Sequence, residues 1–481
     1  MINYGKKITT TRAYPFGNDI EIAVESDRGR IISSAAFRRL QKRTQVFALE
    51  LNASIRSRLT HSLEVAQTAR YIARTILKEL KEDGIDACFL QGLEHAFVSI
   101  AEMSSLLHDI GNPPFGHFGE ETINKWVREN VVERFDALPS SSQTTQELQE
   151  KLKKDIANYD GNAQAIRIVT KLQRLNLTYT QVLSVLKYTR AAFEDRPVDG
   201  NYSYLMKKPG FYYSEGQLIE TMQESLGVKS GHRFPIAYIM EAADDISYLT
   251  ADLEDAVEKG ILSIDELYII IRQLCKEKGE EYLLNVIQTR YDKAKKNNPE
   301  PYVFDMFFTM IRATLIGDLV KYVTRIYIEN HQAIFDGSFN APLLEYDKES
   351  KYYTAIEILQ DIAKQYIYQN KEVQQLELQG YSILTALLNH YSILLDLSAD
   401  DFDRLLQGKR VDCLLSALLV KRLSSKHIVA YRDDLKKVSR DNQEEYKFLE
   451  LYYRTRLIID YISGMTDDYA LHEYQTLQAL K

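Results

Sequence analysis

The chain has 481 residues, of which 45% are hydrophobic and 27% charged, and its formal net charge at pH 7 is −8. This composition is typical of a globular protein with a large core, and the length alone allows two or three domains. The acidic balance argues against a strongly basic nucleic-acid binder, although it leaves room for a local basic channel.

The sequence carries no pattern typical of export or membrane insertion. The polar N-terminus lacks an apolar signal core, and no apolar run approaches the roughly 20 residues that span a bilayer. The three cysteines, Cys88, Cys275 and Cys413, form neither a zinc-ribbon spacing nor a disulfide framework. These features predict a cytoplasmic protein with no membrane partner.

Residues 1–25 are predicted to form an irregular arm, and residues 26–47 a helix that ends near Thr44. Apolar residues recur there at helical spacing, with basic residues between them. The basic residues near its end are Arg38, Arg39, Lys42 and Arg43. We interpret them as a solvated face, with contact to phosphates as the alternative.

A second helix is predicted over residues 57–82 from its apolar stripe. His61 lies in its first turn, with Arg58 three residues earlier on the same side. A lone histidine in such a place is more often a satisfied core residue than a metal ligand.

The next predicted helix runs up to the adjacent pair His108-Asp109. Gly111 is predicted to be its C-cap in a left-handed conformation, and Pro113 and Pro114 prevent the helix from continuing. Polar groups this dense at the end of a core helix need partners, and a metal ion is the simplest one for a neutral His beside an ionised Asp.

The remaining chain is predicted to be mostly helical. Residues 131–155 are interpreted as a mobile surface excursion, 203–216 as a short hairpin or loop, and 178–190 as a helix carrying Lys187 and Tyr188 near its end. Residues 261–481 stay helical, with no Gly/Ser linker and no repeat of fixed period.

A strong helix is predicted over residues 235–260, and it contains the second anomaly of the chain. Asp244 and Asp245 interrupt its most apolar part, where a carboxylate costs several kcal/mol unless it is paired or metal-bound. Asp244, Tyr248 and Asp252 lie four residues apart on an adjacent stripe. Solvated acids on an amphipathic helix are the alternative interpretation.

The sequence therefore predicts an all-α protein that forms one continuous multi-helix body with at most short strands. We expect three regions: an N-terminal arm and helix over 1–57, a core over 58–260, and a helical region over 261–481 that completes the active-site pocket.

Two imidazoles and two carboxylates stand out as candidate metal ligands, namely His61, His108, Asp109 and Asp244. This set suits Mg²⁺, Mn²⁺ or Fe better than a structural zinc, which prefers thiolates. The chain lacks the P-loop pattern and the G-x-S-x-G pattern, so neither a P-loop nucleotide site nor an esterase elbow is supported.

A second group lies next to the expected metal site. His117 and Glu120 are one helical turn apart, so the carboxylate can orient the imidazole, which can then protonate a leaving alkoxide. Arg58, Lys187 and Arg410 are candidates for neutralising an anionic substrate.

Long strings of this sequence resemble the bacterial deoxyguanosine triphosphate triphosphohydrolases, a family of metal-dependent phosphohydrolases in the HD superfamily. The strings include SDRGRIISSAAFRRLQKRTQVF, RSRLTHSLEVAQTARYIA, LLHDIGNPPFGHFGEETIN, DGNAQAIR, LKYTR, YLMKKPG, MEAADDISYLTADLEDAVEKG, LELQGY and DYISGMTDDYA. They run from residue 26 to residue 470. The family's usual FEGNAQ appears here with Asp160 in place of Glu, and residues 131–155 and 411–445 match poorly.

The resemblance implies a role for each matching residue. The implied metal ligands are His61, His108, Asp109 and Asp244, with His117 as the catalytic histidine and Glu120 as its acidic partner. Arg58 and Lys187 fall on phosphate-contacting positions. The implied deoxyribose contacts are Gln45, Tyr188, Tyr248 and Asp252. Glu377 and Arg410 fall in the guanine pocket, for which a surface ion pair is the alternative interpretation.

The implied reaction is hydrolysis of dGTP to deoxyguanosine and inorganic triphosphate, with one divalent metal per site, Mg²⁺ first and Mn²⁺ or another transition metal as the alternative. Relatives form oligomers, often hexamers, and some respond to single-stranded DNA. The competing hypotheses are an HD phosphohydrolase acting on other nucleotides, and a regulator that keeps the site only to bind nucleotide or single-stranded DNA.

Overall fold

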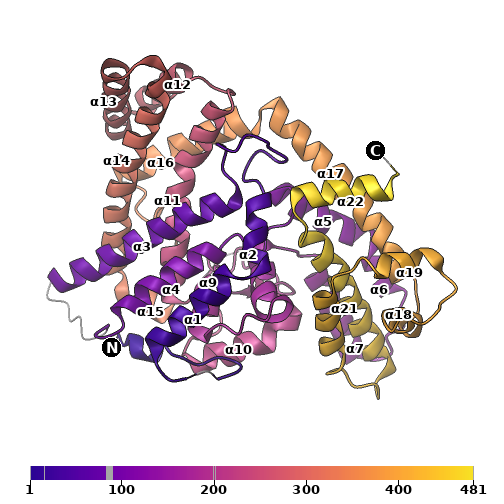
Figure 1. The fold of residues 1–481 in the computed structure, drawn as a ribbon. Helices are drawn as coiled ribbons and strands as arrows, with labels where there is room; N and C mark the ends of the chain where they lie inside the picture. Colours follow the sequence, from indigo (N-terminus) through magenta and orange to yellow (C-terminus); the bar gives the residue numbers. More distant parts are fainter. Residues whose placement is uncertain (1, 16, 83–89, 199, 201, 480–481) are drawn as a thin grey trace.

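The computed structural model describes residues 2–15, 17–82, 90–198, 200 and 202–479. Over these residues the protein is almost entirely helical, which confirms the predicted all-α class (Figure 1). No helix in the described ranges combines the length and hydropathy needed to cross a membrane. Cys275 is a buried free thiol and Cys413 is also free, whereas Cys88 lies outside the described residues.

The first half of the chain forms eleven helices within the described residues. They are α1 (Ile20–Ile32), α2 (Ala35–Arg39), α3 (Arg58–Glu82), α4 (Glu94–Leu107), α5 (Gly116–Asn130), α6 (Val132–Asp136), α7 (Gln143–Ile156), α8 (Gly161–Arg167), α9 (Tyr179–Val185), α10 (Gly216–Ser225) and α11 (Pro235–Glu258). The predicted helices at 57–82 and 235–260 are confirmed as α3 and α11.

The second half continues with α12 (Ile264–Lys278), α13 (Glu281–Asn297), α14 (Glu300–Glu329), α15 (His331–Asp336), α16 (Lys351–Ile362), α17 (Lys371–Ser392), α18 (Ala399–Leu406), α19 (Leu414–Val420), α20 (Ser425–Leu435), α21 (Gln443–Ser463) and α22 (Asp467–Leu477). Short 3₁₀ turns are η1 (Tyr4–Lys6), η2 (Leu40–Lys42), η5 (Tyr213–Glu215) and η7 (Ile393–Leu395), and π-helical turns are η4 (Ile168–Leu172) and η6 (Ala363–Tyr368).

The described strands are β1 (Arg190–Ala191) and β2 (Pro209–Phe211), which pair in parallel with Arg190 opposite Pro209. The segment predicted to be a hairpin or loop therefore contributes a strand, but its partner lies earlier in the chain. The two strands of a hairpin are antiparallel neighbours. Of the two predictions for this segment, hairpin or loop, the loop is therefore closer to the structure.

Two hydrophobic cores organise these helices. The first gathers apolar residues of α3, α4, α9, α11 and α14, and the second those of α5, α7, α17 and α21. Figure 1 shows the first group on the left of the molecule and the second on the right. The turn between α4 and α5 passes from one core to the other, since Ile110 belongs to the first and Ile123 to the second.

The segment 131–155 is not the mobile surface excursion that its polar composition suggested. It forms α6 and most of α7, which packs on α21 through Leu152 and Ile156 of the second core. The buried Asp155 accepts a 2.8 Å hydrogen bond from Arg456 Nη2 and a 2.6 Å bond from the Tyr452 hydroxyl. Polar residues of α7 also lie on its buried face, where Asp155 finds its partners in α21, which is why composition alone misled.

The single helix predicted over 26–47 is also wrong. The chain forms α1, which Asp19 caps from within the expected irregular arm, and then the short α2, which Ser34 caps through the backbone N–H of Phe37. A serine side chain satisfies the free N–H groups of a new helix, so Ser34 divides the segment in two.

Arg43, expected on a solvated face, is buried. Its Nη2 donates to the backbone carbonyls of Ser463 (2.6 Å), the last residue of α21, and of Met465 (2.9 Å). Its Nη1 donates to those of Ile110 and Asn112 beside the His-Asp pair. Burial and the neighbouring Arg39 charge lower the pKa of Arg43 to about 10. We call this interaction the Arg43 clamp.

Replacing Arg43 with methionine should lower the free energy of unfolding by about 3 kcal/mol, because several buried carbonyls lose their donors. Urea denaturation followed by circular dichroism measures this change. Lys42→Met is the matched control: its exposed ion pair with Asp468 is worth about 0–1 kcal/mol. Equal losses in the two variants would contradict the clamp.

Candidate active site

The turn after α4 is shaped by close packing. Gly111 does not have the predicted left-handed conformation; instead, a Cβ there would lie 2.0 Å from the carbonyl oxygen of Gly161, so glycine allows α8 to approach. The left-handed residues are Phe115 (φ 62°) and Gly116 (φ 59°), where the chain enters α5. This reversal places residues 108–109 and 117–120 on the same site.

The candidate metal ligands converge from three helical elements. Donor atoms of His61, His108 and Asp109 lie within 4.8 Å of one another. Oδ1 of Asp244 lies 3.3 Å from His61 Nε2 and 3.4 Å from His108 Nε2. Asp244, rather than Asp245, therefore faces both imidazoles.

Neighbouring groups fix these side chains in orientations that suit a cation. His108 Nδ1 lies 2.7 Å from the Ser105 carbonyl, so it carries the proton and leaves the buried Nε2, which has no hydrogen-bond partner among the described residues, free to bind metal. Asp109 accepts hydrogen bonds from Arg58 Nη1 (2.5 Å) and Asn112 Nδ2 (2.6 Å).

The electrostatics keep both carboxylates ionised. Burial raises the pKa of Asp109, but Arg58 and the imidazoles outweigh it and lower the pKa to about 2. Burial likewise opposes ionisation of Asp244, yet His108, His61 and Lys187 hold its pKa far below the usual range. Two ionised carboxylates beside two imidazoles fit a divalent cation of borderline hardness.

A second group occupies the start of α5. His117 Nδ1 lies 2.9 Å from Glu120 Oε2, while Oε1 of Glu120 accepts the backbone N–H of Gly161 at 2.7 Å. Burial raises the pKa of Glu120, but His117 and Lys208 outweigh it and keep it below the usual range. The carboxylate can thus hold the Nδ1 proton, leaving Nε2 of the exposed His117 to act on a ligand.

Gly161 joins these two groups. A Cβ at this position would lie 2.1 Å from Asn112 Oδ1 and 2.9 Å from Glu120 Oε1. Asn112 holds the candidate metal ligand Asp109, and Glu120 holds His117. Only glycine lets both supporting side chains keep these positions.

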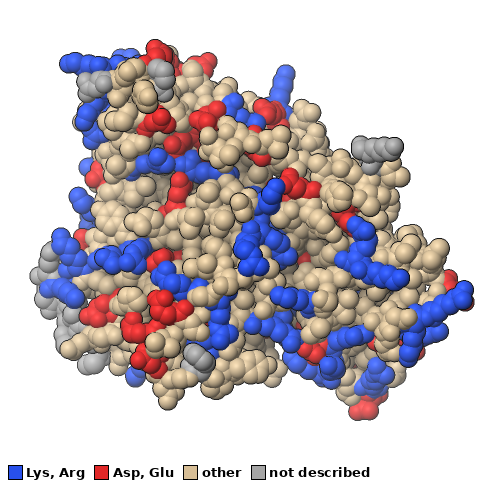
Figure 2. Space-filling view, in the orientation of Figure 1, with Lys and Arg blue, Asp and Glu red and all other residues tan. Residues whose placement is uncertain are grey.

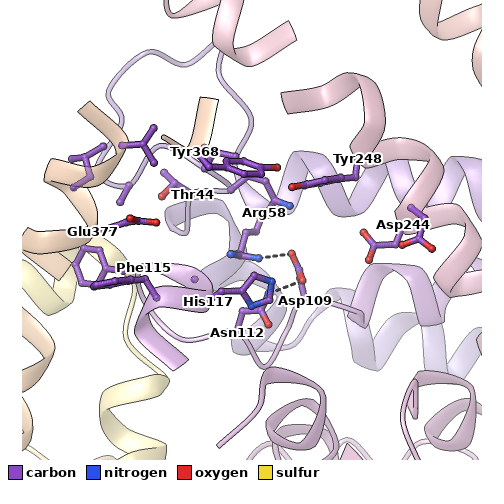
Figure 3. Close-up of a pocket in the computed structure, with 18 residues that line it drawn as sticks. Thr44, Arg58, Asp109, Asn112, Phe115, His117, Asp244, Tyr248, Tyr368 and Glu377 are labelled. Carbon is purple, nitrogen blue, oxygen red and sulfur yellow. Dashed lines mark hydrogen bonds and ion pairs between the residues drawn. The ribbon is translucent and has the colours of Figure 1, made fainter. Parts of the chain in front are cut away.

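A cavity of about 480 Å³ connects the two groups (Figure 3). Asp244 and Tyr248 lie at one side of the view and Glu377 and Phe115 at the other, with His117 between them. The cavity is therefore long enough to present one end of a ligand to the metal ligands and the other end to Glu377.

The structure places the other predicted residues unevenly. Gln45, Arg58, Tyr248 and Glu377 line the cavity, and Gln45 Oε1 is buried without a hydrogen-bond partner in the described chain. Lys187 lies behind the wall, 3.6 Å from Asp244 Oδ2.

Tyr188 and Asp252 are buried and outside the residues found to line the cavity. Arg410 is exposed after α18 and is not among the lining residues, and no described contact joins it to Glu377. Neither the predicted base-pocket pair nor the surface ion pair is formed within this chain.

Several residues at the site were missed by the sequence analysis. Asp467, at the start of α22, accepts hydrogen bonds from the backbone N–H groups of Thr44 (3.0 Å) and Phe115 (3.2 Å), both of which line the cavity. Tyr368 also lines the cavity and donates its hydroxyl hydrogen to Asp252. The string DYISGMTDDYA pointed to the Asp467 region but not to its contacts.

Comparison with known proteins supports this site. An HD domain model matches residues 58–176, and a phosphohydrolase-associated domain model matches residues 419–476. The HD domain implies binding of a divalent metal. The second match contains Ser463, Met465 and Asp467, whose contacts hold the cavity wall and the turn after α4.

The chain is also similar along its whole length to curated bacterial proteins. Proteins from Salmonella typhimurium and Klebsiella pneumoniae are each 42% identical to it, and one from Cronobacter sakazakii is 44% identical. Each alignment covers 100% of this chain and 98% of the relative, and each relative is named deoxyguanosinetriphosphate triphosphohydrolase.

Replacing Asp244 with asparagine should abolish stoichiometric metal binding, because a carboxylate that faces both imidazoles loses its charge. Metal content after dialysis against Mn²⁺, measured by mass spectrometry, tests this. Asp245→Asn is the matched control and should keep its metal. Retention of metal by the Asp244 variant would remove it from the ligand set.

Proposed function

The chain belongs to the deoxyguanosinetriphosphate triphosphohydrolase family, and we propose that it hydrolyses dGTP to deoxyguanosine and inorganic triphosphate. The observation that carries the proposal is the joining of a four-residue metal site and an oriented His–Glu pair by one elongated cavity.

The triphosphate end of the substrate fits the side of the cavity that contains Asp244. A divalent ion held by His61, His108, Asp109 and Asp244 supplies a Lewis acid there, with Mg²⁺ the proposed ion and Mn²⁺ the alternative. Arg58 lines the same wall, and Lys187 lies 3.6 Å from Asp244. Both cations can offset charge that develops on the transferring phosphoryl group.

His117 is proposed as the general acid. Water attacks the α-phosphorus, the bond to the 5′-oxygen breaks, and His117 Nε2 donates a proton to that oxygen. Glu120 fixes the opposite ring nitrogen at 2.9 Å and stabilises the charged imidazolium.

The sugar and base lie between His117 and Glu377 in this proposal. The unpartnered Gln45 Oε1 in the cavity wall is a suitable acceptor for the 3′-hydroxyl. Tyr248 lines the cavity where it can exclude a 2′-hydroxyl. Glu377 can accept from N1–H and N2–H₂ of guanine.

The finer proposals concern assembly and location. Exposed apolar residues on α19, including Leu414 and Leu418, support a homo-oligomer, for which we propose a hexamer. Lys and Arg side chains gather over α2 and towards α7 and α21 in Figure 2, which supports single-stranded DNA as an effector. We also propose a cytoplasmic location, which suits an enzyme with dGTP as its substrate.

The decisive experiment incubates the purified protein with each deoxynucleoside triphosphate and GTP, in Mg²⁺ or Mn²⁺, and identifies both products. The proposal requires deoxyguanosine and intact triphosphate from dGTP. Release of orthophosphate or pyrophosphate would favour another HD phosphohydrolase, and tight binding without turnover would favour a regulator.

His117→Ala should lower kcat by about 10²–10⁴-fold while metal content stays normal, because the general acid is lost but the metal ligands remain. Steady-state kinetics and metal analysis on the same sample test this. Turnover near that of the unmodified enzyme would exclude His117 as the acid.

Glu377→Gln should reduce the dGTP preference over dATP, measured as the ratio of kcat/KM values, by about 10- to 100-fold, because an amide replaces an acceptor-only carboxylate. Glu372→Gln, an exposed acid on the same helix α17, serves as the control and should leave the ratio unchanged. An unchanged ratio in the Glu377 variant would contradict its place in the base pocket.

A further inference from the structure

A second cavity, of about 750 Å³, lies away from the active site, beside the N-terminal segment. It is bounded by η1, by the chain after α10 and by the end of α15. Its lining includes three lysines and one carboxylate. The charged residues are Lys6, Lys7, Lys229 and Asp336. None of the predicted site residues contributes to it.

Lys7 is the unusual member of this group. Its side chain is 4% exposed, and its ammonium lies 5.0 Å from the ring centre of Phe335 and 5.9 Å from that of Phe234. In the described chain it has neither an ion pair nor a side-chain hydrogen bond. Burial lowers the pKa of Lys7 to about 8, with Asp336 opposing that effect. A buried ammonium without an anionic partner is costly, so this position favours an anion.

Asp336 does not neutralise the lysines. Its Oδ2 accepts a 2.8 Å hydrogen bond from Gln332 Nε2, and it lies beyond ion-pair distance of Lys7. Lys6 and Lys229 are exposed at the mouth, so the lining carries a net charge of about +2 when all three lysines are protonated.

Hydrogen bonds hold part of the lining in place. His232 Nδ1 donates to the Asp336 carbonyl (2.6 Å), and its Nε2 lies 3.0 Å from the Tyr202 hydroxyl. Tyr202 has a left-handed backbone (φ 78°), which a tyrosine rarely adopts. Strained residues held by such contacts are typical of binding sites that are formed before the ligand arrives.

We propose that this cavity binds a small phosphate-bearing anion, with Lys7 pairing from the inside and Lys6 and Lys229 at the mouth. A phosphoryl group carries two negative charges, which would balance the net positive charge of the lining. The volume of the cavity is in the range that holds a small molecule rather than a bare ion. Free polyphosphate and a nucleotide share this chemistry. The structural alternative is that Lys7 only packs against the two phenylalanine rings.

The first test uses Lys7→Met, which keeps the aliphatic stem on Phe335 but removes the charge. Isothermal titration of the metal-loaded protein with inorganic triphosphate should show one binding site per chain fewer in this variant than in the unmodified protein. Lys447→Met, an exposed lysine outside the cavity, is the matched control and should lose none. Equal stoichiometry in the Lys7 variant would overturn the proposal.

Thermal unfolding separates binding from a packing role. Without ligand, Lys7→Met should melt at the same or a higher temperature than the unmodified protein, because an unpaired buried charge has been removed. A packing role for the ammonium predicts a lower temperature, and that result together with unchanged binding would overturn the proposal. Turnover without added anion should stay unchanged, since Lys7 lies outside the active site.

A second variant guards against misfolding of the first. Lys6→Gln combined with Lys229→Gln changes only exposed side chains and should weaken the Lys7-dependent site about tenfold, with less effect at high salt. Parallel titrations with orthophosphate, triphosphate and GMP identify the source: tighter binding of GMP indicates a nucleotide, and tighter binding of triphosphate indicates a polyphosphate. No binding of any probe that depends on Lys7 would overturn the proposal.

Discussion

The Arg43 clamp is the interaction on which the arrangement of the site depends. A guanidinium has donors in a fixed planar fork, and here they end on carbonyls of the turn after α4 and at the end of α21. No carboxylate in the described chain lies within ion-pair distance, so peptide carbonyls are the direct partners of the charge, and the Asp467 carboxylate adds a more distant attraction. Those carbonyls must therefore keep pointing at the Arg43 guanidinium. This fixes the turn after α4 against the C-terminal helices.

This constraint explains why the site lies between two hydrophobic cores. The candidate metal ligands lie in α3, directly after α4 and in α11 of the first core, whereas His117 and Glu377 belong to α5 and α17, which pack in the second. Asp467 adds another link, because its carboxylate holds both Thr44 and Phe115 in the cavity wall. The candidate metal ligands and the candidate acid His117 therefore belong to separate hydrophobic cores, and polar contacts keep the two cores in a fixed relative position.

Sequence reasoning found the residues whose chemistry is anomalous in its local setting. An acidic residue in the apolar middle of α11 and a His-Asp pair at a helix end are visible without a fold, and so is the all-α class. It missed contacts made across hundreds of residues, such as Thr44 with Asp467, because nothing local distinguishes them. It also misjudged 131–155 and Arg43, where polar residues are buried through partners that only the fold supplies.

Gly161 has a consequence for how this enzyme can change over generations. Because the space beside its Cα is shared by the side chains that hold Asp109 and His117, any larger residue disturbs both at once. A substitution at this position therefore acts on the supports of the candidate metal cluster and of the candidate acid together. A change that affects one of them alone is expected elsewhere in the chain.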